Sequence, residues 1–132
     1  MFMDKNLTDV TLVLDRSGSM KIGLCEWNRG LNKFIAGQKE SALRVVFTLA
    51  QFDDIYEVIH SAVPVKEIGE CDIIPRGNTA LLDAVGKAIV STGARIVAMP
   101  EGSRPGLVVF VILTDGMENS SKEYTRGRIK EM

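Results

Sequence analysis

One aspartate and two serines, spaced two residues apart, come directly after the apolar run at residues 10–14. Asp15, Ser17 and Ser19 place a carboxylate and two hydroxyls at positions i, i+2 and i+4. In a turn that leaves a β-strand, side chains at this spacing can converge on one point. Hard oxygen ligands of this kind suit Mg²⁺, Mn²⁺ or Ca²⁺ better than zinc or copper. The segment therefore predicts part of a divalent-cation site.

Two further segments of the chain are rich in oxygen ligands. Residues 77–79 end in the hydroxyl of Thr79, and residues 114–116 carry the carboxylate of Asp115. Both segments contain glycine, which is typical of loops. Together with Asp15 and its two serines, they outline one candidate metal site.

The elements that must position these residues alternate between strand and helix. β-branched and aliphatic residues at 8–14 predict a buried strand. A helical period follows, with one apolar face made of Trp27, Leu31, Phe34 and Ile35. Two strands are then expected at 43–52 and 56–63, and the short turn between them predicts an antiparallel hairpin.

The second half of the chain continues the alternation. A long helix is expected to open at Thr79, and the unbroken apolar run at 107–113 predicts a strand covered on both faces. A short helix is expected after Ser120. This order predicts an α/β sheet with helices on both faces. In such sheets ligands bind beyond the carboxyl ends of the strands, which is where Asp15 and Asp115 fall.

Length and composition limit the possible functions. The 132 residues fit a single domain, 1–132, with 45% hydrophobic and 25% charged residues. A net charge of −1 gives no electrostatic reason to expect nucleic acid or an anionic membrane as a partner. No run reaches the roughly 18 apolar residues of a membrane span. The first residues lack the basic and then apolar pattern of a signal peptide, so a cytoplasmic protein is expected.

The three polar segments, in this order, resemble a known family. Residues 15–19 resemble the DxSxS element of von Willebrand factor A (vWA) domains, the fold shared with integrin I domains. Thr79 stands where that family has its metal-binding threonine, and Asp115 looks like the family's second aspartate. The sequence around Thr79 is similar to that of intracellular bacterial or phage members of the family. The resemblance implies a three-layer, Rossmann-like sheet that is mainly parallel, with one antiparallel strand in the hairpin.

The resemblance also implies a function. The five residues Asp15, Ser17, Ser19, Thr79 and Asp115 would form a metal-ion-dependent adhesion site (MIDAS) that holds Mg²⁺, with Mn²⁺ or Ca²⁺ as alternatives. Because only two of these ligands are carboxylates, the ion would keep positive charge for an Asp or Glu of a protein partner. The implied activity is protein binding without catalysis.

One departure from the family concerns the end of the domain. Members usually carry two more strands and a final helix, so the domain is expected to be incomplete at its C-terminus, as a fragment of a longer chain. In the family's strand order, 3-2-1-4-5-6, the strand at 107–113 would become a sheet edge. A long apolar edge invites pairing, so a homodimer through 107–113 is the other expectation.

Two other functions fit the same residues. Asp15 at a strand end could be the nucleophile of a metal-dependent phosphoryl-transfer enzyme. The domain could instead be a structural interaction module without metal.

Arg16 and Arg76 are expected to be solvated charges on the flanking loops, or charges that attract an acidic partner. Asp83 could orient the site or favour the helix N-terminus.

Overall fold

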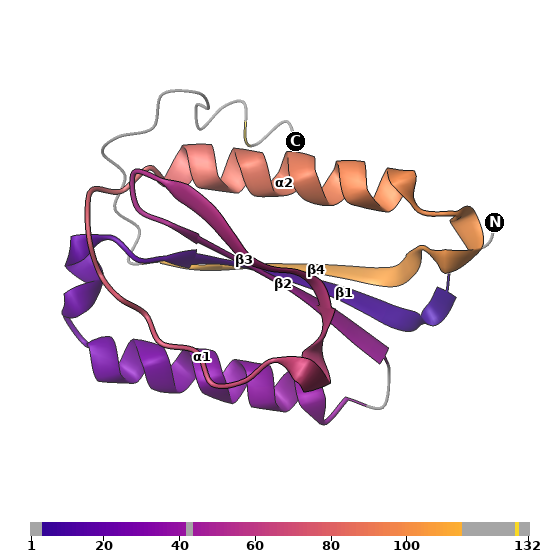
Figure 1. Cartoon of the computed structure of the whole chain (residues 1–132), viewed down its shortest axis with the longest axis horizontal. Helices are drawn as coiled ribbons and strands as arrows, with labels where there is room; N and C mark the ends of the chain where they lie inside the picture. Colours follow the sequence, from indigo (N-terminus) through magenta and orange to yellow (C-terminus); the bar gives the residue numbers. More distant parts are fainter. Residues whose placement is uncertain (1–3, 42–43, 115–128, 130–132) are drawn as a thin grey trace.

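A sheet forms the central layer of the molecule, and one long helix lies on each of its faces (Figure 1). The computed structural model describes residues 4–41, 44–114 and 129. Its helices and strands are β1 (Asp4–Asp15), α1 (Leu24–Lys39), β2 (Arg44–Phe52), β3 (Tyr56–Pro64), α2 (Leu81–Ala98) and β4 (Pro105–Leu113). Short 3₁₀ turns connect them at η1 (Gly18–Lys21), η2 (Val65–Glu67) and η3 (Glu101–Ser103).

The strands of the described residues are arranged in the order β3-β2-β1-β4. β1 runs parallel to β2 and β4, and β3 pairs antiparallel with β2. Asp15 lies opposite Phe52 of β2, and Leu14 lies opposite Leu113 of β4, so the carboxyl ends of three parallel strands meet. The predicted α/β class, the hairpin and the order of these strands are confirmed. The layout is consistent with a Rossmann-like sheet.

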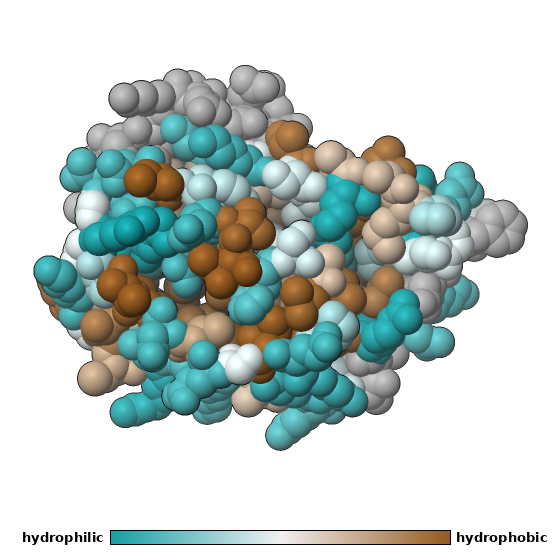
Figure 2. Space-filling view, in the orientation of Figure 1, coloured by the Kyte–Doolittle hydropathy of each residue, from teal (hydrophilic) through white to brown (hydrophobic). Residues whose placement is uncertain are grey.

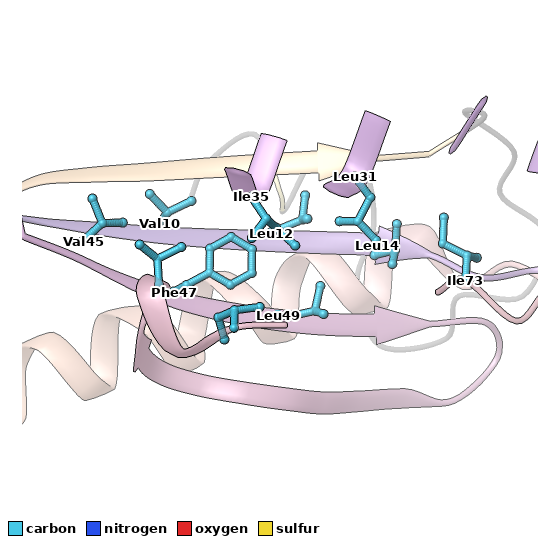
Figure 3. Packing of buried hydrophobic residues seen from close by; sticks show 11 residues of the cluster. Val10, Leu12, Leu14, Leu31, Ile35, Val45, Phe47, Leu49 and Ile73 are labelled. Atoms are coloured by element: carbon cyan, nitrogen blue, oxygen red, sulfur yellow. The ribbon is translucent and has the colours of Figure 1, made fainter. Parts of the chain in front are cut away.

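The alternation of side chains along β1 builds both halves of the core. Val10, Leu12 and Leu14 point to α1 and pack with Leu31 and Ile35 of that helix (Figure 3). Residues of the opposite parity point to α2, because successive side chains of a strand face opposite sides of the sheet. A smaller apolar cluster lies there, made of Val13, Phe52, Ala84 and Ala88. β1 is therefore buried on both faces, and its last residue, Asp15, ends in the interior.

The strand predicted at 107–113 is present as β4, but the prediction that it is covered on both faces is wrong. Leu107, Val108 and Ile112 remain 54%, 45% and 41% exposed. The cause is position, because β4 pairs only with β1 in the described sheet and lies at its edge. Residues 7–15 of β1 are all buried between the two helices, whereas β4 is covered only in part.

The start of α2 differs slightly from the prediction. The helix begins at Leu81 rather than at Thr79, and Ala80 precedes it as the N-cap residue. Thr79 is therefore a loop residue. Asp115 and the helix expected after Ser120 lie outside the described residues, apart from residue 129.

The other edge strand also exposes apolar side chains. Val58 and Ile59 of β3 are 46% and 43% exposed. On the face drawn in Figure 2, apolar residues form separate patches among hydrophilic ones.

Among the helices that the structure describes, none combines the length and apolar character needed to cross a membrane.

Candidate functional site

Asp15, the last residue of β1, is fully buried at the carboxyl end of the sheet. Its Oδ1 atom accepts a hydrogen bond of 2.8 Å from the backbone N–H of Ser17. Its Oδ2 atom accepts one of 2.7 Å from the hydroxyl of Thr114, the residue that follows β4. The expectation that the ends of the first and last predicted strands meet at one place is therefore confirmed.

The two serines lie together on the turn that follows Asp15. Their hydroxyl oxygens are 3.1 Å apart, with Ser17 buried and Ser19 exposed. The short 3₁₀ turn η1 fixes this geometry, because the N–H of Met20 donates to the carbonyl of Ser17 and the Met20 side chain is fully buried. The turn therefore carries one buried and one exposed hydroxyl directly after the buried carboxylate.

The loop that carries Thr79 docks against this turn. The N–H of Arg76 donates to the carbonyl of Arg16 at 2.7 Å, and the N–H of Gly18 donates to the carbonyl of Gly77 at 3.0 Å. Thr79 itself is buried, 2% exposed. Four of the predicted ligands therefore lie at the end of β1 or on two loops in direct contact, and the fifth, Asp115, lies outside the described residues.

Gly77 is required by the close approach of this loop. Its φ is +70°, a left-handed conformation that L side chains rarely adopt. A Cβ atom there would also stand 2.5 Å from Oδ1 of Asp54 and 2.8 Å from Oδ2 of Asp53. The glycine lets the backbone of the Thr79 loop lie against the end of β2.

Asp53, which follows β2, is the residue of this region that the sequence interpretation missed. Its carboxylate is 2% exposed and binds two arginines, with Oδ2 3.0 Å from Nε of Arg76 and Oδ1 3.6 Å from Nη2 of Arg16. The rule that picked out Asp15, a polar residue at the carboxyl end of a parallel strand, also fits Asp53. The hairpin pattern in the sequence predicts only a turn residue at this position.

The expectation of a solvated charge is wrong for Arg16. Its side chain is only 6% exposed, and its Nη1 atom lies 2.7 Å from Oε1 of Glu57 and 3.3 Å from Oε1 of Gln51. The physical reason is that Asp53 and Glu57 supply negative charge at the end of the hairpin, which draws the guanidinium inward. Arg76 is 55% exposed, although it is also ion-paired.

Burial raises the pKa of two groups outside this region. One is the phenol of Tyr56 on β3. The other is the thiol of Cys71, whose pKa the neighbouring Asp72 also raises and Lys39 lowers. Both groups therefore stay protonated and uncharged at neutral pH.

Asp83, placed near the site by the sequence, is buried in the first turn of α2.

The ligand atoms of the site fit a hard cation. The buried Asp15 carboxylate accepts hydrogen bonds from two neutral donors, and the adjacent hydroxyls of Ser17 and Ser19 supply further hard oxygens. Within residues 4–41 and 44–114, no group of three or more His, Cys, Asp or Glu side chains could hold a metal. A site here would therefore depend on hydroxyl ligands as well as carboxylates.

Neither a protein-family model nor a curated protein sequence significantly matches the chain. Its function must therefore be inferred from its own residues and from their positions in the fold.

Proposed function

We propose that this chain is a vWA-type domain that binds a divalent cation, Mg²⁺ first and Mn²⁺ or Ca²⁺ as alternatives, and through it an acidic residue of a protein partner. The proposed ligands are Asp15, Ser17, Ser19, Thr79 and Asp115. The observation that carries the proposal is the fully buried Asp15 carboxylate beside the paired hydroxyls of Ser17 and Ser19. The sheet order and the contact between the two loops support the same assignment.

Each residue has a distinct role in this proposal. Asp15 supplies negative charge from the interior, and the N–H of Ser17 orients its carboxylate. Ser17, Ser19 and Thr79 add neutral oxygens, so these three ligands cancel none of the charge of the cation. A bound cation supplies a Lewis-acidic contact for a carboxylate of the partner. Because Ser19 is exposed, we expect that carboxylate to approach from its side.

Calorimetric titration of the chelator-treated protein with Mg²⁺ and Mn²⁺, to millimolar concentration, tests the proposal. One-site binding is expected for the wild type and none for Asp15→Ala. Glu70→Ala is the control. Glu70 is an exposed acidic residue in the loop that follows η2, and this variant should bind the cation as the wild type does. Absence of binding by the wild type, or unchanged binding by a folded Asp15→Ala protein, contradicts the proposal.

A metal-free interaction domain is the second candidate function. It is favoured by the fact that both oxygens of Asp15 already accept hydrogen bonds. It predicts that Asp15→Asn keeps the fold and that chelator changes neither the unfolding temperature nor partner binding. The metal-dependent proposal predicts a lower unfolding temperature for the wild type in chelator, because a ligand that binds only the folded state stabilises it.

The proposal assigns the chain no catalysis. The enzyme alternative would use Asp15 as a nucleophile, and no contact of the described residues favours it over a ligand role. A phosphatase assay with Mg²⁺ separates the two. Turnover by the wild type that is lost in Asp15→Asn would support the enzyme and contradict the binding module.

The β4 edge supports self-association as a further part of the proposal. Leu107, Val108 and Ile112 are exposed on a strand that pairs on one side only in the described sheet. Apolar edges of this kind pair readily with another strand. Light scattering should therefore show a dimer, and Val108→Lys should shift it to monomer. A stable monomer of the wild type at high concentration contradicts this part.

A further inference from the structure

Asp53 lies where the two loops of the candidate site meet. Its carboxylate accepts a hydrogen bond from the N–H of Ile55 at 2.9 Å and one from Nε of Arg76 at 3.0 Å. Its backbone carbonyl accepts the N–H of Ala80 at 2.9 Å. The residue is 2% exposed, so these contacts are formed in the interior. Asp53 is therefore bound to the hairpin and to the start of α2 at once.

The two arginines at Asp53 come from the two ligand loops. Arg16 stands between Asp15 and Ser17, and Arg76 stands three residues before Thr79. Their side chains meet on the two oxygens of one carboxylate, and the N–H of Arg76 donates to the carbonyl of Arg16. A shift of either loop would break one of these contacts.

We propose that Asp53 is a positioning residue for the cation site, which acts through Arg16 and Arg76 to hold the Ser17–Ser19 turn against the Thr79 loop. The inference rests on the proposed function and deepens it. Asp53 itself ligates nothing in this account. Its effect on cation affinity comes from fixing the relative position of the ligand oxygens, as residues behind metal ligands do in other proteins.

The direction in which cation affinity changes when Arg76 loses its charge separates a positioning role from a purely electrostatic one. Removing the positive charge of Arg76 should strengthen the binding of a cation if only long-range charge matters. If Arg76 fixes the Thr79 loop, its removal should weaken binding instead. Arg76 is 55% exposed, so its replacement should leave the fold intact.

The first experiment is calorimetric titration with Mn²⁺ of the wild type, Arg76→Gln and Arg29→Gln. Arg29 is an exposed arginine of α1 and controls for the loss of one positive charge. We expect about tenfold weaker binding for Arg76→Gln, at the lower end of such effects, and unchanged or slightly tighter binding for Arg29→Gln. Binding by Arg76→Gln that equals or exceeds that of Arg29→Gln would overturn the inference.

The second experiment uses Asp53→Asn and measures amide hydrogen exchange without metal. Asp9→Asn is the control, because Asp9 is an equally buried aspartate paired with an arginine elsewhere, Arg95 of α2. Exchange at the amides of Gly18, Arg76 and Ala80 should be about tenfold faster in Asp53→Asn than in the wild type and unchanged in Asp9→Asn. Unchanged exchange in Asp53→Asn overturns the inference.

The two experiments distinguish the failure of this inference from failure of the proposed function. If the wild type binds no Mn²⁺, the proposed function fails and the effect on cation affinity fails with it, while exchange still decides whether Asp53 joins the loops. If the wild type binds Mn²⁺ and Arg76→Gln binds it as tightly as Arg29→Gln does, the proposed function stands and the positioning role is wrong.

Discussion

Two buried aspartates of this chain, Asp9 and Asp53, bind arginine in different ways. Asp9 of β1 forms a bidentate pair with Arg95 of α2, with distances of 2.5 and 3.1 Å. Asp53 divides its carboxylate between Arg76 at 3.0 Å and Arg16 at 3.6 Å. The first pair joins a strand to a helix, with one partner for each charge. The second joins two loops, with two positive charges on one carboxylate.

The difference shows in how well the arginines are satisfied. Arg95 donates from both terminal nitrogens to Asp9. Arg16 has two buried nitrogens, Nε and Nη2, without a hydrogen-bond partner in the described structure. A buried donor without a partner costs roughly 1–3 kcal/mol. The Asp9 pair is therefore suited to stabilise the fold, whereas the Asp53 cluster gives up hydrogen bonds to bring the two loops together.

The largest effect is expected from Asp9→Ala, which tests the stabilising half of this comparison. Removing one partner of a buried pair leaves a charge without compensation, and such changes cost about 3 kcal/mol or more. Because Arg95 is 22% exposed and can turn partly to water, we expect the free energy of unfolding to fall by about 3 kcal/mol. Urea unfolding measures it, and cation binding by the folded variant should be unchanged.

A double variant sharpens this prediction. Asp9→Val with Arg95→Leu replaces the pair by apolar side chains, which is often neutral for stability. The double variant should therefore recover most of the loss seen in Asp9→Ala. A further loss of stability in the double variant would mean that the pair itself, rather than the penalty of an unpaired charge, stabilises the contact between β1 and α2.

Glycine replacements give the next largest effect and have opposite signs in the two regions. Gly77→Ala should destabilise the protein by about 1–2 kcal/mol, because alanine is strained at positive φ and its Cβ would clash with Asp53 and Asp54. Gly93→Ala, on α2 two residues before Arg95, meets no atom within 4 Å and should stabilise by about 0.5–1 kcal/mol. Thermal unfolding of both variants provides the measurement. Equal effects would remove the argument for a tight loop contact at Gly77.

Local patterns predicted much of this structure. The turn at Asp15, Ser17 and Ser19 follows from a short motif after a buried strand, and the short connection between β2 and β3 determines their hairpin. Both depend on residues that are neighbours in sequence. The meeting of β1 and β4 was predictable as well, because parallel strands in one sheet bring their carboxyl ends together.

Contacts between distant residues were not predictable in the same way. Asp53 is 37 positions from Arg16 and 23 from Arg76, and nothing in the sequence assigns one carboxylate to both. The exposure of β4 was missed for a related reason. An unbroken apolar run predicts a strand, but whether helices cover it depends on its place in the sheet.

The smallest effect is expected from Arg76→Gln, measured as stability instead of cation affinity. The Arg76–Asp53 pair involves a side chain that is 55% exposed, and pairs at such positions contribute about 0.5 kcal/mol. In 1 M NaCl, where the screening length is about 3 Å, the difference from the wild type should largely vanish. The loss in Asp9→Ala should persist, because the Asp9 carboxylate is 1% exposed and salt does not reach it. If Arg76→Gln instead lost about 2 kcal/mol of stability and this loss were insensitive to salt, both arginine clusters would stabilise the fold. The distinction between a pair that stabilises the fold and a cluster that positions loops would then no longer hold.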